Sequence, residues 1–100
     1  MLFKNKQIRF SPEKNAQLKK ERGVGFEDVY LAINSNNILA NLAHPNTEKY
    51  PNQSVLIILI SIKNYVYIVP YVEDEHTVFL KTIIPSRKMN KRYNTEKHND

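Results

Sequence analysis

Two short stretches of the sequence carry the residue types best suited to chemistry on a phosphate. The first is PSRK, residues 85–88, which follows an apolar run containing Lys81 and continues into Lys91 and Arg92. The second is EKY, residues 48–50, in a polar loop. Arginine offers phosphate a planar fork of donors, a carboxylate can accept a proton, and tyrosine can stack on a base or donate a proton. These residue types together could cleave RNA.

The reaction that fits them is attack of a ribose 2′-hydroxyl on the neighbouring phosphate. It needs a base, cations that stabilise the charge on the phosphorane, and an acid for the leaving 5′-oxygen. We assign Arg87 and Lys81 to the phosphate, Glu48 to the base, and Tyr50 to stacking or to the acid. The RNA backbone would be contacted by three further cations: Lys88, Lys91 and Lys49. This site forms only if the loop of Glu48 and the segment of Arg87 meet at one end of a sheet.

Other kinds of site find less support. His44, His76 and His98 are scattered without the spacing of metal ligands. The chain has no cysteine, which excludes disulfides, thiolate catalysis and cysteine-rich zinc sites. Its two glycines form neither a phosphate-binding loop nor a G-x-S-x-G motif. We therefore expect no metal and no cofactor.

Size and charge set the broad class. One hundred residues suffice for one small domain with a modest core, and a net charge of +5 favours a polyanionic or acidic partner. The longest apolar run, residues 55–62, is far shorter than the roughly 20 residues of a membrane span. The N-terminus does not resemble a secretory signal, so we expect a cytoplasmic protein without membrane contact.

Helix signals are clearest near the N-terminus. Ser11 can cap a helix that runs over 12–22, Pro12 suits its first position, and Gly23 suits its C-terminal end. A second helix over 26–34 follows from apolar residues at helical spacing, namely Phe26, Val29, Tyr30 and Ile33.

Strands account for most of the remainder. Alternating or continuous apolar runs predict strands over 7–10, 38–45, 54–62, 65–73 and 77–84, then a helix over 86–93 and a disordered tail over 94–100. Asn64 suits the turn between two of these strands, and Pro70 indicates a bulge or an unpaired edge. Tyr65, Tyr67 and Tyr71 share one strand face, where they either serve the site or pack beneath a helix.

The predicted fold class is α+β, with a single domain over residues 1–93. An antiparallel sheet of about four strands is covered on one face by two N-terminal helices, followed by a short C-terminal helix, and its other face is partly open.

Two motifs resemble the BrnT-family toxins, which belong to the RelE-like superfamily of bacterial toxin–antitoxin ribonucleases. Phe10, Ser11 and Lys14 lie where that family has an aromatic residue, an Asp and a Lys, and its Gly-Val-x-Phe-Glu block matches residues 23–27. Residues 85–88 are similar to the family's Ser-Ala-Arg-Arg/Lys segment before its last helix. Glu21 and Arg22 depart from the Lys-His usual there.

The resemblance implies a RelE-like fold and a metal-independent endoribonuclease that inhibits translation. It also implies a cognate antitoxin, often a ribbon-helix-helix protein, that holds the toxin silent in a hetero-oligomer. Arg87 is carried over most directly by position, and Glu48 and Tyr50 less so. Catalysis in this superfamily tolerates varied residue sets.

Two rival hypotheses remain. The chain could be a non-catalytic basic module that binds an acidic protein or a nucleic acid, in which case Glu48 is an ordinary surface residue. A DNA-binding regulator is a further alternative, although no helix-turn-helix with a basic recognition helix is visible.

Overall fold

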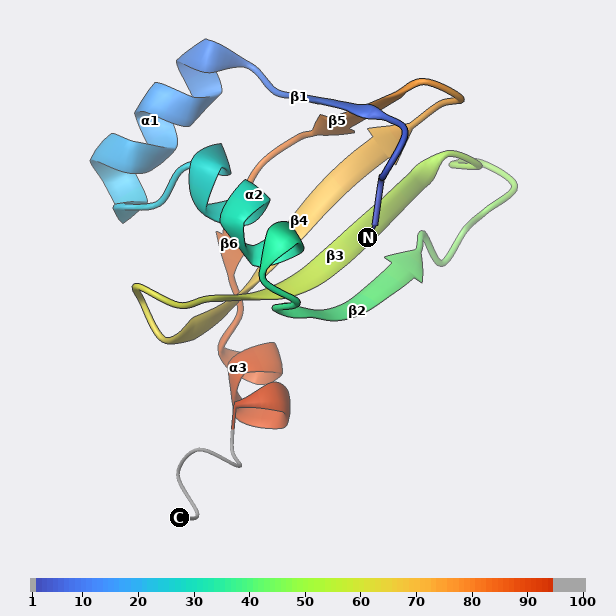
Figure 1. Ribbon diagram of the computed structural model, residues 1–100. Coiled ribbons are helices and arrows are strands. Elements are labelled where there is room, and N and C mark those ends of the chain that lie inside the picture. The colour runs from blue at the N-terminus through green and yellow to red at the C-terminus, as the bar shows by residue number, and fades with distance from the viewer. Residues whose placement is uncertain (1, 95–100) are drawn as a thin grey trace.

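Local signals set the two N-terminal helices where the sequence predicts them. The computed structural model describes residues 2–94. Helix α1 spans Pro12–Arg22, and the Ser11 hydroxyl accepts a hydrogen bond from the backbone N–H of Lys14 at 3.1 Å. Gly23 ends the helix with a left-handed backbone at φ 70°, and helix α2 spans Phe26–Asn34. Both helices lie over the same face of the sheet (Figure 1).

The core lies between these helices and the sheet. Helix α2 buries Phe26, Val29, Ala32 and Ile33, whereas Leu18 is the apolar residue that α1 buries. Full burial of a Val, Leu, Ile or Phe side chain contributes about 1.5–3 kcal/mol. Helix α1 therefore depends on polar contacts to hold it in place.

Asn15 makes the central polar contact between the two helices. Its side-chain oxygen accepts from the backbone N–H of Phe26 at 2.7 Å, and its amide donates to the Glu27 carboxylate. Lys19 pairs with the same carboxylate at 3.0 Å. Gly25 leaves room for this arrangement, because a Cβ there would lie 2.8 Å from the Asn15 oxygen.

The centre of the sheet is a long antiparallel hairpin. Strand β3, Gln53–Ile60, pairs with strand β4, Tyr65–Glu73, over eight consecutive residues. The turn between them contains Asn64 at φ 49°, which confirms its predicted role. Strand β2, Ile38–Ala43, pairs with β3 and forms one edge of the sheet.

The sheet is mixed, with six strands in place of the four or so antiparallel strands predicted. One of the two additional strands is β1, Gln7–Arg9, which runs parallel to β5, Thr77–Leu80. A strand of three residues has no pattern that identifies a partner some 70 residues away. The coarse prediction, a small α+β domain with its first two helices on one face, is confirmed.

The prediction of one continuous last strand over 77–84 was wrong. Strand β5 ends at Leu80, and a two-residue strand β6, Ile84–Pro85, pairs with Tyr67 and Ile68 of β4. The residues between them leave the ladder opposite Pro70, which lacks an N–H to share with a neighbouring strand. Ile83 becomes fully buried in the core. Of the two interpretations of Pro70, a bulge or an unpaired edge, the unpaired edge is confirmed, because the ladder on this side of β4 is interrupted there.

The two faces of β4 have different environments. Tyr67 and Tyr71 are buried in the core under the helices, which confirms that they pack there. On the opposite face, Ile57 and Val66 are buried, while Leu42, Phe79 and Ile84 are 48%, 38% and 40% exposed. That face is partly open, as predicted.

Helix α3, Arg87–Tyr93, follows β6 directly and contacts β4. Asn94, which the sequence assigns to a disordered tail, is instead buried and caps this helix. Its amide donates to the backbone oxygen of Asn64 in the β3–β4 turn. Residues 95–100 of that predicted tail lie outside the described residues. Within the described part of the chain, no helix has the length and apolar character needed to cross a membrane.

Replacement of Asn15 tests the polar attachment of α1. We expect Asn15→Leu to lower the free energy of unfolding by roughly 2–3 kcal/mol, because the N–H of Phe26 loses its acceptor. Chemical denaturation followed by circular dichroism measures this. Gln17→Leu, on the exposed side of the same helix, should change it by less than about 0.5 kcal/mol. Equal effects of both changes would contradict the role given to Asn15.

Candidate functional site

The register of β4 separates the two halves of the predicted site. Gln53, three residues after Tyr50, pairs with Val72 near one end of β4. Ser86, just before Arg87, donates its backbone N–H to Val66 near the other end. Val66 and Val72 are six positions apart along the strand, a separation of roughly 20 Å. The expectation that Glu48 and Arg87 meet at one end of the sheet was therefore wrong.

The loop that carries Glu48, Lys49 and Tyr50 folds on itself at the Val72 end. Asn46 organises it, because its side chain and backbone oxygens accept from the N–H groups of Lys49 and Tyr50. The rings of His44 and Tyr50 lie 4.4 Å apart between centroids, and the Lys49 ammonium lies 5.4 Å from the Tyr50 ring centre. Glu48 is exposed and forms no ion pair with any residue in 2–94.

A shallow groove of about 430 Å³ opens beside this loop. Its walls include Lys49, Tyr50, Thr77 and Phe79, together with the acidic residues Glu73 and Asp74. The groove thus offers aromatic surface, but its charge is mixed. Two carboxylates against one lysine make it a poor environment for a phosphate.

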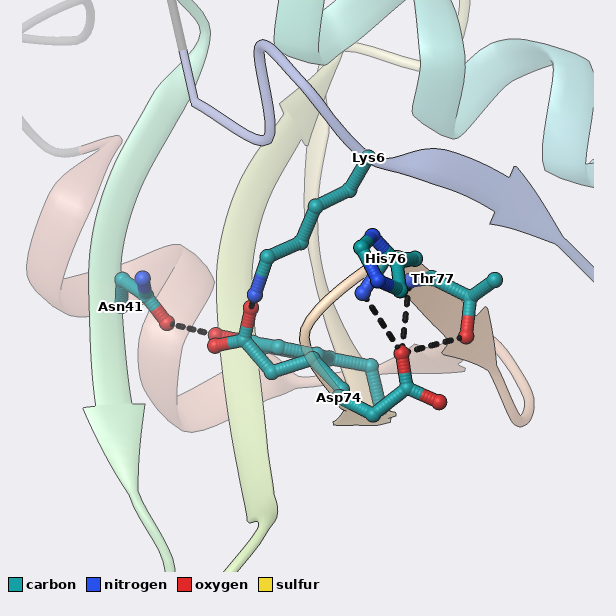
Figure 2. Close-up of polar contacts among 7 residues, drawn as sticks. Lys6, Asn41, Asp74, His76 and Thr77 are labelled. Atoms are coloured by element: carbon teal, nitrogen blue, oxygen red, sulfur yellow. Dashed lines mark hydrogen bonds and ion pairs between the residues drawn. The ribbon is translucent and has the colours of Figure 1, made fainter.

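The acidic residues at this end have internal partners. Lys6 from the N-terminal segment reaches Glu73 at 2.7 Å, and the Tyr71 hydroxyl donates to Asn41 on β2. Figure 2 shows the Asp74 carboxylate turned toward His76 and Thr77. It accepts hydrogen bonds from their backbone N–H groups at 2.8 and 2.7 Å, respectively. These hydrogen bonds lower the pKa of Asp74, and burial raises the pKa of Tyr71. This group of side chains stabilises the β4–β5 turn.

The chain that runs back along β4 toward its other end is rich in cations and has no acidic residue. No Asp or Glu occurs from residue 76 to residue 94, a stretch that contains five cations: Lys81, Arg87, Lys88, Lys91 and Arg92. All five are exposed, and among residues 2–94 none of them forms an ion pair. We call these five side chains the basic segment.

Two devices fix the basic segment on the sheet. The Ser86 hydroxyl accepts from the Met89 N–H at 3.2 Å and so starts helix α3, which sets Arg87 and Lys88 in its first turn. Asn90 accepts from the backbone N–H of Val66 at 3.1 Å, which ties α3 to β4. Lys81 lies further along β4, where its backbone N–H donates to Pro70. The structure therefore brings Arg87 and Lys88 together, with Lys91 one turn later.

Arg22 supports this end of the sheet, a role that sequence reasoning missed. Its guanidinium, at the end of α1, donates to the backbone oxygen of Ile83, between Lys81 and Arg87. In the sequence Arg22 is only a cation at a helix C-terminus. Its partner could not be predicted, because Ile83 leaves the ladder only when Pro70 interrupts it.

Arg22 also lies near the hydroxyl of Tyr67, which is the β4 residue that pairs with Pro85 of β6. Burial raises the pKa of Tyr67, the nearby Tyr65 and Asp28 add to the rise, and Arg22 opposes it. Tyr67 therefore stays protonated at neutral pH and is a donor, not a base.

Metal ligands do not gather within the described residues. Across positions 2–94, no three His, Asp or Glu side chains lie close enough together to hold a metal ion. Of the three histidines, His44 and His76 lie in separate loops, and His98 falls outside the described residues.

Comparison with known protein families, curated proteins and solved structures finds no match to this chain. The resemblance to BrnT toxins therefore stays a prediction from the sequence.

Replacement of Arg22 tests its support of the basic segment. We expect Arg22→Ala to speed hydrogen exchange of the amides from Lys81 to Ser86 and to cost about 1 kcal/mol of stability, since the Ile83 oxygen loses its charged donor. Exchange mass spectrometry measures the first effect. Lys20→Ala is a matched control on the same helix, and equal exchange in both variants would contradict the role of Arg22.

Proposed function

We propose that this protein is the toxin of a bacterial type II toxin–antitoxin pair and that it acts on RNA through the basic segment. Two observations support this. The first is the resemblance of residues 10–27 and 85–88 to BrnT toxins. The second, which carries the proposal, is a set of five exposed cations in a stretch, residues 76–94, that contains no Asp or Glu; four of the five lie on α3, beside β6.

The chemistry proposed is cleavage of the RNA backbone without a metal. The 2′-hydroxyl gives its proton to solvent and its oxygen bonds to phosphorus, while the bond to the 5′-oxygen breaks and that oxygen takes a proton from solvent. The products are a cyclic phosphate and a 5′-hydroxyl. Arg87 and Lys88, in one helical turn, would bind the phosphate oxygens and stabilise the charge that grows on them. Lys81 and Lys91 would hold the neighbouring backbone, and Lys49 lies too far along the sheet to share that phosphate.

Glu48 is not proposed as the base that acts with Arg87. The separation of roughly 20 Å along β4 excludes direct proton transfer between a nucleotide at Arg87 and this carboxylate. The proposed site instead relies on positioning and on charge stabilisation, which are large catalytic terms by themselves. Tyr50, in the same loop as Glu48, is likewise set aside as the acid.

A second candidate function is favoured by that same separation. A basic module that binds an acidic protein or a nucleic acid without cleaving it needs the cations but neither Glu48 nor Tyr50. In both cases we place the protein in the cytoplasm, and in the first we expect a cognate antitoxin to cover the basic segment in a hetero-oligomer.

Replacement of Arg87 tests the leading proposal. We expect Arg87→Ala to abolish growth arrest on expression without antitoxin and to stop cleavage of added RNA by the purified protein. Arg87→Lys should restore RNA binding but little of the cleavage, because it lacks the planar fork. Lys4→Ala, near the acidic end, is the control and should act like the wild type. A folded Arg87→Ala variant with full toxicity would refute the assignment.

RNA binding and RNA cleavage separate the two candidate functions. For the leading proposal, single-stranded RNA should be cut, and Arg87→Ala should reduce the slope of log affinity against log salt by about 0.7. Binding with the same salt dependence but without cleavage or growth arrest would favour the non-catalytic module.

Replacement of Glu48 tests whether this carboxylate is too far from Arg87 to take part in cleavage. Because Glu48 lies at the far end of β4, we expect Glu48→Gln to leave the cleavage rate within about twofold of the wild type, a change smaller than 0.5 kcal/mol in barrier height. Single-turnover cleavage of a labelled RNA measures this. A loss of a hundredfold or more would show that the two ends of the sheet work together.

A further inference from the structure

The three edges of the sheet differ in how well they are protected against pairing. The edge strand β1 has only three residues and includes Arg9, and β6 has two residues, one of them Pro85. Short length, charge and proline are the usual means by which an edge avoids another strand. The edge strand β2 has six residues, ILANLA, with neither a charge nor a proline. It is the unprotected edge of the three.

The backbone of β2 has hydrogen-bonding groups left over. His44 donates to Gln53 at 2.9 Å, and the register continues through the pairs Ala43–Ser54 and Leu42–Val55. Residues of an antiparallel strand alternate between bonding to the neighbour and pointing away. The N–H and C=O groups of Asn41 and Ala43 therefore point outward from the sheet. Both residues are exposed.

The charge distribution decides what kind of strand suits this edge. The chain carries a net charge of +5, yet residues 29–47 contain no Asp, Glu, Lys or Arg. Around Asn41, on the helix-covered side, Lys4 lies together with Glu73 and Glu75, so both signs are present. A second copy of the chain would meet little like-charge repulsion at β2, and its basic segment would remain distant. A neutral edge suits a neutral strand, and β2 itself is one.

We propose that two copies of this protein pair through β2 in antiparallel fashion about a two-fold axis at Leu42. In this register Asn41 of each copy lies opposite Ala43 of the other, so the outward groups form four backbone hydrogen bonds. Leu42 then faces Leu42 of the second copy in a non-hydrogen-bonded pair, where side chains approach most closely. Leu42 is 48% exposed in the single chain, so the contact gives it an apolar neighbour.

The same features limit how strong this pairing can be. Pro45 has no N–H and the register of β2 is irregular between Ile38 and Ala40, so the pairing covers about five residues of each copy. Two strands that pair over five residues bury less surface than a stable interface of standard size. The dimer is therefore concentration-dependent, and it joins two sheets into one continuous sheet that leaves both basic segments free.

The solution mass tests the dimer. Sedimentation equilibrium of the full chain should show a rise from one copy to two with increasing concentration. Leu42→Lys places two cations on the axis, and Ala43→Pro removes an outward N–H without breaking the β2–β3 ladder, so both should stay monomeric. Ile62→Lys, a matched change at a residue 72% exposed in the β3–β4 turn, should still dimerise. Circular dichroism confirms that each variant is folded.

Cysteine cross-linking tests the register, and the absence of native cysteine makes each single substitution specific. Leu42→Cys should form an intermolecular disulfide on mild oxidation, because Cα atoms in such a pair lie about 4.5 Å apart. Ala40→Cys lies on the same face but faces His44 of the second copy, about 13 Å along the strand from the other Ala40. It should not cross-link.

The proposal is overturned by a chain that stays monomeric at every concentration, by a dimer that survives Leu42→Lys, or by equal cross-linking at Leu42 and Ala40. A monomer whose β2 amides become protected from exchange only when a different protein is added would also overturn it.

Discussion

The pairing of β3 with β4 is the constraint on which the rest of the structure depends. Eight consecutive residue pairs and a four-residue turn fix this hairpin, and the residues of β3 and β4 on the helix-covered face form the base of the core under α2. Every other element is placed against one of these two strands or against a neighbour of theirs. The loop of Glu48 is held at one end of the hairpin, and β6 with α3 is held near its turn. The distance between candidate functional groups is therefore a property of this single register.

Helices α1 and α3 are held in place mainly by hydrogen bonds, with little buried apolar surface of their own. Helix α1 is anchored by Asn15 to α2 and by Arg22 to the segment before β6, whereas Leu18 is its buried apolar side chain. Helix α3 has no buried residue of its own and is held through Ser86, Asn90 and Asn94. Helix α3 carries four of the five cations of the basic segment, and Arg22 of α1 contacts Ile83, which lies between the fifth, Lys81, and Arg87. The cations of the basic segment are thus positioned by hydrogen bonds to the backbone, which fix direction more strictly than apolar packing does.

The sequence predicted what depends on neighbouring residues. The bounds of α1, α2 and β4 were correct, because caps and apolar periodicity act within a few residues. Asn64 adopts the positive φ that its turn needs, and the ladder is interrupted beside Pro70, which has no N–H. Long-range pairing could not be predicted. The parallel pairing of β1, the interruption of the last strand and the position of Glu48 relative to Arg87 all follow from the register of distant strands. The candidate residues of the Glu48 loop and of α3 therefore lie as two groups at opposite ends of β4, and the prediction of one shared centre was wrong.

The opposite character of the two ends of β4 has a consequence for how the molecule moves through solution. Glu73, Asp74 and Glu75 lie at one end, and the four cations of α3 lie at the other. Such a charge separation gives the protein a permanent dipole along the hairpin. In the field of a polyanion this dipole exerts a torque, so the molecule turns its α3 end forward before any contact is made. The fold would thereby select an orientation during diffusion, with the acidic β4–β5 turn facing away.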